Sequence, residues 1–188
     1  MARHFEVSEF LGCGAQLEIG TDASPFGFGG WLSLNGKILQ YFAAPISEHD
    51  VNIFGHDVGS SEGQQTWESL AILIAARLWT SSVTNRRLSL RVRGDNVGAL
   101  TLLVKMRPST AQQAIIGREL ALVFARAAFP PSVLHTPGIA HKVADQLSRV
   151  YDPKAQANTD HPALDGAVRV EVEARPRQWY RALHEHAA

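Results

Sequence analysis

The chain has 188 residues, of which 45% are hydrophobic and 19% are charged, so it holds enough apolar material for a core of ordinary size. Its eighteen basic and eighteen acidic residues cancel. Bulk charge therefore gives no argument for binding nucleic acid, a membrane surface or an acidic substrate, and any such partner must be held by local groups.

The cysteine content and the start of the chain indicate the expected location. Cys13 is the single cysteine and has no partner for an internal disulfide, and residues 1–10 lack the charged-then-apolar layout of a signal peptide. The longest strongly apolar run, from Leu70 to Ala76, is too short to cross a bilayer. We therefore expect a soluble, intracellular protein, in either the cytoplasm or the nucleus.

The first part of the chain predicts three antiparallel strands. Apolar and polar residues alternate over 16–23, and two more strand patterns follow over 27–34 and 38–45. The pair Asn35-Gly36 separates the second pattern from the third. This pair is a strong hairpin signal, because both central residues of a type I′ turn need a positive φ.

The middle of the chain predicts a long loop followed by helices and one strand. Residues 46–64 are polar, carry glycine and serine and show no period, which is typical of a loop. Large apolar residues then recur at helical spacing over 65–79. A strand is predicted over 87–95, a second helix over 96–105 and a longer helix over 109–128.

The last predicted elements of the core are a strand over 132–136 and a helix that ends near residue 150. This order predicts an α/β fold with a mixed five-stranded sheet, three antiparallel strands and then two parallel ones, flanked by helices. We divide the chain into an N-terminal extension (1–15), one domain (16–150), and a turn-rich linker with a C-terminal tail (151–188). The tail is expected to form a strand and a short helix.

Four carboxylates fall at the ends of these elements: Asp22, Glu68, Asp95 and Asp145. Taken singly, each is best explained as a turn former, a first-turn helix acid or a helix cap. In a mixed sheet of this order, however, all four can converge at one edge of the central strands. Clustered carboxylates repel one another unless cations neutralise them, and Mg²⁺ or Mn²⁺ prefers oxygen ligands. The set therefore predicts two-metal phosphoryl-transfer chemistry.

The segments TDASPFGFGGWL, WESLAIL, RGDNVGAL and HTPGIAHKVADQLSR follow one another between residues 16 and 150. Together they resemble the four motifs of the ribonuclease H domain of retroelement reverse transcriptases. The last segment is similar in particular to the long-terminal-repeat and tyrosine-recombinase types. The resemblance is specific because the four motifs occur in order, and no single one would suffice.

The resemblance implies a ribonuclease H-like fold that cleaves the RNA strand of RNA–DNA hybrids with two Mg²⁺ ions, for which Mn²⁺ would substitute. It also implies a partner, a reverse transcriptase polymerase domain or another hybrid-binding module. Metal ligation is carried onto the four carboxylates, and a proton-shuttling or product-release role onto His135, ten positions before Asp145. Ser24 and Asn96, beside the ligands, are candidates for contacts with the 2′-hydroxyls of RNA.

The chain departs from the family pattern in three places. His141 stands where the last motif usually has asparagine, which predicts a looser helix start or an altered loop beside His135. The segment 46–64 is longer than usual, and no basic protrusion follows the first helix apart from TNRRLS at 84–89. Because phosphate neutralisation supplies most non-specific affinity, we expect this neutral chain to bind hybrid weakly on its own.

Two alternatives to this function stay open. Another nuclease of the same superfamily, such as a resolvase or an exonuclease, has similar carboxylates, but the motif order and the ADQLSR ending argue against it. A non-catalytic structural or connection domain has no reason to keep four repulsive charges together.

Arg91 and Arg93 lie on the polar face of their predicted strand. They either form a solvated face or contact phosphate groups, and the solvated face is the favoured interpretation.

Overall fold

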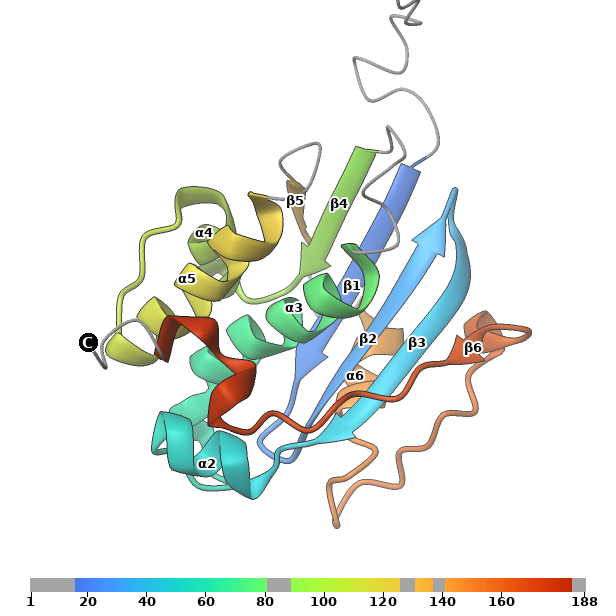
Figure 1. Cartoon of the computed structure of the whole chain (residues 1–188). Helices are drawn as coiled ribbons and strands as arrows, with labels where there is room; N and C mark the ends of the chain where they lie inside the picture. The colour runs from blue at the N-terminus through green and yellow to red at the C-terminus, as the bar shows by residue number, and fades with distance from the viewer. Residues whose placement is uncertain (1–15, 81–88, 126–130, 137–140, 184–188) are drawn as a thin grey trace, which may run out of the picture.

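The computed structural model describes residues 16–80, 89–125, 131–136 and 141–183, which form one mixed sheet with helices on both faces (Figure 1). The strands are β1 (Gln16–Ala23), β2 (Gly27–Leu34), β3 (Lys37–Pro45), β4 (Ser89–Gly94), β5 (Ser132–His135) and β6 (Val168–Arg169). The helices are α2 (Glu48–Phe54), α3 (Gln64–Thr80), α4 (Val97–Lys105), α5 (Ala111–Phe124) and α6 (Lys142–Ser148). Within the described ranges, no helix is long and apolar enough to cross a membrane.

The sheet confirms the predicted α/β architecture, with strand order β5-β4-β1-β2-β3-β6. β1, β2 and β3 pair antiparallel, whereas β4 is parallel to β1 and β5 is parallel to β4. The predicted hairpin is present between β2 and β3, where Asn35 has φ 51° and Gly36 has φ 85°. This turn joins β2 to β3, whereas β1 pairs with β2 on one side and with β4 on the other and so lies inside the sheet.

The sheet has a sixth strand that the sequence did not predict as part of it. β6 comes from the C-terminal tail and lies parallel to β3, with Gln40 opposite Val168 and Tyr41 opposite Arg169. Val170 N–H also donates to the carbonyl of Tyr41 at 2.8 Å. An open edge strand presents unpaired backbone groups, and the extended tail satisfies some of those of β3.

The prediction of an irregular loop over 46–64 is wrong, because α2 and a short 3₁₀ helix lie within it. A capping box starts α2: Ser47 N–H donates to Asp50 Oδ2 at 2.8 Å, and Asp50 N–H donates to Ser47 Oγ at 3.3 Å. Gly55 ends the helix in the left-handed region, at φ 70°. Phe54, at the end of α2, is buried in the core.

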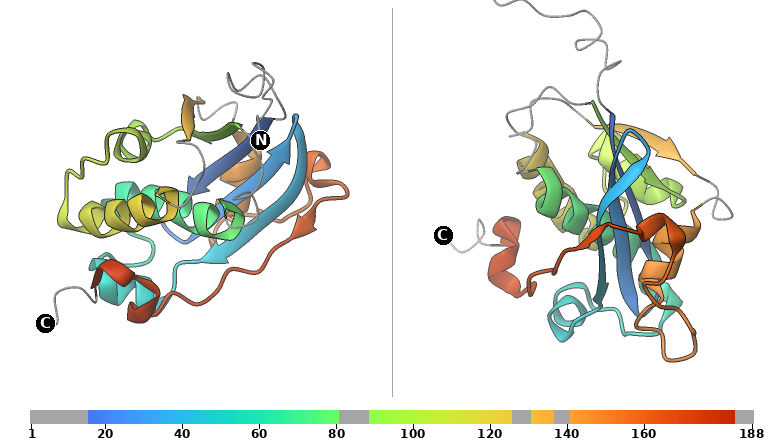
Figure 2. Two further views of the ribbon diagram at one scale, coloured as in Figure 1. Left: turned by 45° about the horizontal axis from the view of Figure 1, so that its top comes forward. Right: turned by 90° about the vertical axis from the view of Figure 1, so that its right-hand side faces the viewer.

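Two layers of helices cover the sheet (Figure 2). α3 packs against β1 and β2 and is itself covered by α5, whereas α6 packs on the opposite face against β1 and β2. α6 approaches β2 so closely that a Cβ atom on Gly29 would lie 2.4 Å from Ser148 N and 2.6 Å from Ala144 O. Glycine at position 29 therefore permits the contact that brings α6 beside the end of β1.

The C-terminal tail crosses the lower part of the molecule and packs against α2, α3 and α5 (Figure 1). Arg175 is buried and pairs with Asp50 of α2, at 2.6 Å between Nη2 and Oδ2. Tyr180 is fully buried, and its ring meets that of Phe54 edge to face at a centroid distance of 5.6 Å. Tyr180 is part of the same hydrophobic core as α3, while the domain division at residue 150 stays a prediction.

Candidate metal centre

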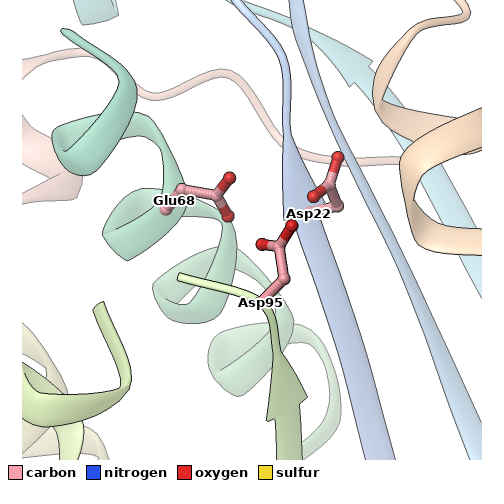
Figure 3. A group of neighbouring side chains, drawn as sticks. All are labelled: Asp22, Glu68 and Asp95. Carbon is pink, nitrogen blue, oxygen red and sulfur yellow. The ribbon is translucent and has the colours of Figure 1, made fainter. Parts of the chain in front are cut away.

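Three carboxylates meet at the edge of the sheet where β1 and β4 end (Figure 3). Asp22 lies near the end of β1, and Asp95 directly follows β4, the parallel neighbour of β1. Glu68 reaches the same place from α3, one turn after the helix begins at Gln64. One oxygen atom from each carboxylate lies within 4.8 Å of the others. Asp22 and Glu68 are each only 5% exposed.

The surroundings oppose negative charge on these groups. Burial is the largest cause that raises the pKa of Glu68 well above its ordinary value, and the charges of Asp22 and Asp95 add to it. Burial likewise raises the pKa of Asp22 from 3.8 to about 7, against the effect of a hydrogen bond from Ser148. A divalent cation would relieve this repulsion, and three convergent carboxylates supply the oxygen ligands that Mg²⁺ or Mn²⁺ prefers.

Two neutral side chains hold these carboxylates, and sequence reasoning missed both. Ser148 of α6 donates its hydroxyl to Asp22 Oδ2 at 2.6 Å. Gln64 donates from Nε2 to Glu68 Oε1 at 3.0 Å. Helical spacing carries a signal for Gln64, which lies four residues before Glu68. The contact of Ser148 with Asp22 spans 126 residues and has no such local signal.

Asp145 lies beside the cluster but is not one of its three members. Its Oδ1 accepts a hydrogen bond from Arg149 Nε at 2.7 Å, and the side chain is 44% exposed. Two observations place it near Asp22: its charge raises the pKa of Asp22, and Ser148 Oγ also lies 2.9 Å from its backbone carbonyl. A role for Asp145 as fourth ligand stays a prediction.

The other predicted site residues have different surroundings. His135 is exposed at the end of β5, and its Nε2 lies 3.1 Å from the backbone carbonyl of Asp95. Asn96 Oδ1 accepts from Ala99 N–H at 2.9 Å, so Asn96 is the cap of α4. Ser24 is 3% exposed, and its hydroxyl donates to Ser148 C=O at 2.7 Å. That contact gives Ser24 a structural role in joining the end of β1 to α6.

His141 ties α6 to β1 through its ring. The side chain is 4% exposed, and Nε2 lies 2.8 Å from the carbonyl of Thr21, one residue before Asp22. Its backbone carbonyl accepts from Asp145 N–H at 3.2 Å, but the side chain makes no capping hydrogen bond. The His141 ring therefore links β1 to α6 instead of capping the helix. The other predicted effect of His141, an altered loop beside His135, concerns residues 137–140, which lie outside the described residues.

The two arginines of β4 form an ion-pair cluster on the sheet face. Arg91 Nη1 lies 3.0 Å from the Glu18 carboxylate, and Arg93 Nη2 lies 2.9 Å from it. Both arginine side chains are about one-third exposed, at 34% and 31%. This pairing favours the partly solvated face over phosphate contacts. Apart from Ser89, the TNRRLS segment lies outside the described residues.

The shifted pKa of Asp22 predicts a pH-dependent stability in the absence of metal. Well below pH 3.8 the carboxyl is neutral in the folded and in the unfolded protein. Between pH 3.8 and about 7 the unfolded chain releases the proton while the folded chain keeps it. Folding therefore weakens as pH rises, by at most about 4 kcal/mol. Asp22→Asn stays neutral, so it should differ from the wild type by less than about 1 kcal/mol at pH 4 and be clearly more stable at pH 8.

Urea unfolding in a chelator at the two pH values measures this difference. Asp160→Asn is the control, because Asp160 is exposed and lies in the tail. Equal stability of Asp22→Asn and wild type at pH 8 would contradict the electrostatic description of the cluster.

Comparisons with known proteins support the fold. No protein-family model matches the chain, and no curated protein sequence matches it. Among solved structures, LC11-RNase H1, isolated from compost by a metagenomic approach, is similar with a TM-score of 0.52 and 15% identity, covering 70% of this chain and 91% of that one. RNase H1 from the halophilic archaeon Halobacterium salinarum NRC-1 is similar with a TM-score of 0.53 and 13% identity, covering 74% and 99%. The chain therefore has the α/β fold of the RNase H1 enzymes.

Proposed function

We propose that this chain is a metal-dependent ribonuclease H that hydrolyses the RNA strand of RNA–DNA hybrids. The observation that carries the proposal is the convergence of Asp22, Glu68 and Asp95, with oxygen atoms within 4.8 Å of one another. Two of these carboxylates are almost completely buried. The likeness to two RNase H1 structures supports the same activity.

The three carboxylates would hold Mg²⁺, with Asp145 as the proposed fourth ligand of a two-ion site. When bound, such ions activate water and stabilise the leaving oxygen of the phosphodiester. The protein's own contribution is to hold the ligands in place: Ser148 fixes Asp22, and β1 and β4 fix the separation of Asp22 and Asp95. Asn96 lies beside the ligands, where we propose that it contacts the RNA strand.

His135 is proposed to move a proton at the edge of this site. A backbone carbonyl accepts hydrogen bonds only, so the contact with Asp95 C=O requires a proton on Nε2. The neutral ring then has its lone pair on Nδ1, which is the atom that can take up a proton. Since the side chain is exposed, this proton can be exchanged with water.

His135→Ala should slow turnover by about 100-fold, the low end of what a positioned acid or base contributes. The affinity for metal should not change, because the ring binds the backbone of Asp95 and not its carboxylate. Single-turnover cleavage and calorimetric metal titration measure the two quantities. His49→Ala, on the exposed side of α2, is the control. Loss of metal binding in His135→Ala would instead make the histidine a ligand or a structural support.

The direct test is cleavage of end-labelled duplexes with and without Mg²⁺. We expect the chain to cut the RNA strand of an RNA–DNA hybrid and to leave duplex DNA and duplex RNA intact. Cleavage of a four-way DNA junction or of DNA ends would favour a resolvase or an exonuclease of the same superfamily. Hybrid that stays intact with Mg²⁺ and with Mn²⁺ would favour the non-catalytic connection domain.

We further propose that the chain works as the ribonuclease H domain of a retroelement reverse transcriptase-like protein. The order of the four motifs and the ADQLSR ending support this more specific assignment. The equal numbers of acidic and basic residues also agree with a domain that does not capture its substrate unaided. A polymerase domain already holding the hybrid would present it at high effective concentration.

Fusion to a hybrid-binding module should therefore lower the Michaelis constant for hybrid by about 100-fold at fixed ionic strength, with little change in kcat. The isolated chain should be a weak nuclease that works best in Mn²⁺ and low salt. Steady-state kinetics with and without the fused module, at two salt concentrations, measure the difference. Tight binding of hybrid by the isolated chain at physiological salt would contradict the need for a partner.

A further inference from the structure

Gln64 bridges the two elements that supply the buried carboxylates. Its Nε2 donates to the carbonyl of Ala23 at 2.5 Å and to Glu68 Oε1 at 3.0 Å. Ala23 directly follows Asp22 on β1, whereas Glu68 belongs to α3. We propose that Gln64 is a positioning residue that aims Glu68 at the metal centre and sets the distance between α3 and the end of β1.

The chemistry of the amide suits both contacts. A glutamine NH₂ group has two N–H donors, and here one acceptor is a backbone carbonyl and the other is a carboxylate. The two donors diverge from one nitrogen, so a single side chain orients Glu68 relative to Ala23. When Glu68 is ionised, the form in which a carboxylate binds a metal ion, this becomes a charge-assisted hydrogen bond, which is among the stronger ones in proteins.

The position of Gln64 in α3 places its side chain beside that of Glu68. Gln64 is the first residue of α3, and Glu68 follows one turn later on the same side of the helix. Glu68 has a long side chain whose rotamers are entropically costly to fix. The amide restricts that freedom before metal binds, which is the usual task of residues that orient a ligand from outside the metal's own shell.

The test replaces Gln64 by methionine, which is similar in length but donates no hydrogen bond. Gln112→Met is the matched control, because Gln112 also donates from Nε2 to a backbone carbonyl of another element, that of Phe54 at 3.3 Å. Gln64→Asn is the second variant: it keeps an amide but is one methylene too short to span both acceptors. Calorimetric Mn²⁺ titration of each protein without hybrid gives a readout that is independent of cleavage.

We expect both Gln64 variants to bind Mn²⁺ about tenfold more weakly and to lose about tenfold in kcat, with the Michaelis constant for hybrid unchanged. Gln112→Met should change none of these. Unchanged Mn²⁺ affinity in the Gln64 variants, with or without a lower melting temperature, would reduce Gln64 to a structural contact. A raised Michaelis constant with unchanged Mn²⁺ affinity would assign it to the substrate. Either result would overturn the proposal.

This inference rests on the proposed metal-dependent function, and the titration separates the two. If the wild-type protein binds no Mn²⁺, the proposed function fails. If the wild type binds Mn²⁺ and the Gln64 variants bind it equally well, only the positioning role fails.

Discussion

Asp95→Asn is expected to abolish cleavage of RNA–DNA hybrid, with a loss of more than about 100-fold, beyond the typical effect of residues that only orient ligands. The fold should persist and become slightly more stable without metal. Asp95 is partly exposed, and its charge raises the pKa of both Asp22 and Glu68. Asparagine keeps the shape of the side chain and removes one charge from a repulsive group.

Two measurements on the same preparation check this prediction. Cleavage of labelled hybrid in Mg²⁺ gives the loss of activity, and urea unfolding in a chelator gives the gain in stability. Asp160→Asn removes an exposed charge from the tail and should change neither quantity. Normal hybrid cleavage by Asp95→Asn would refute the site assignment, since none of the proposed chemistry proceeds without this ligand.

The convergence of Asp22, Glu68 and Asp95 could be predicted from the sequence because these carboxylates sit at element ends. The period-two pattern located β1, and the carboxyl ends of two parallel neighbours, β1 and β4, meet at one edge of a sheet. Glu68 followed from the helical period of α3. Asp145 lies beside these three carboxylates, where its side chain pairs with Arg149 one turn later, and its role as fourth ligand stays a prediction.

The errors came from short elements and from distant contacts. α2 has only seven residues, too few for a helical period to emerge over the polar sequence around it. Its capping box, Ser47 with Asp50, was the available signal. The contact between Arg175 and Asp50 spans 125 residues, and no local pattern encodes it. No local pattern predicts either that Tyr180 of the tail packs into the core.

The buried ion pair of the tail gives the second large prediction. Arg175 donates to both carboxylate oxygens of Asp50, at 2.9 Å from Nε and 2.6 Å from Nη2, and its Nη2 also bonds Pro45 C=O at 3.0 Å. The Asp50 side chain is completely buried. Arg175→Met would leave that carboxylate with donors from Ser47 but without its cation. Loss of one partner of a buried pair costs about 3–5 kcal/mol.

Urea unfolding at neutral pH measures this cost, and Arg169→Met in the same tail is the control. Arg169 is 40% exposed, lies 3.9 Å from Glu171, and donates to Tyr151 Oη at 3.3 Å and to Ala43 C=O at 3.5 Å. Because these contacts are partly exposed and leave no buried charge unpaired, its loss should cost only about 1 kcal/mol. The double variant Arg175→Met/Asp50→Asn should recover part of the loss, because it leaves no unpaired charge in the core. A cost below about 1 kcal/mol for Arg175→Met would mean that the tail adds little to the fold. A cost of several kcal/mol that the double variant recovers only in part would instead show that the tail supports the candidate metal centre, since α2 packs through Phe54 against Trp67, the residue before Glu68.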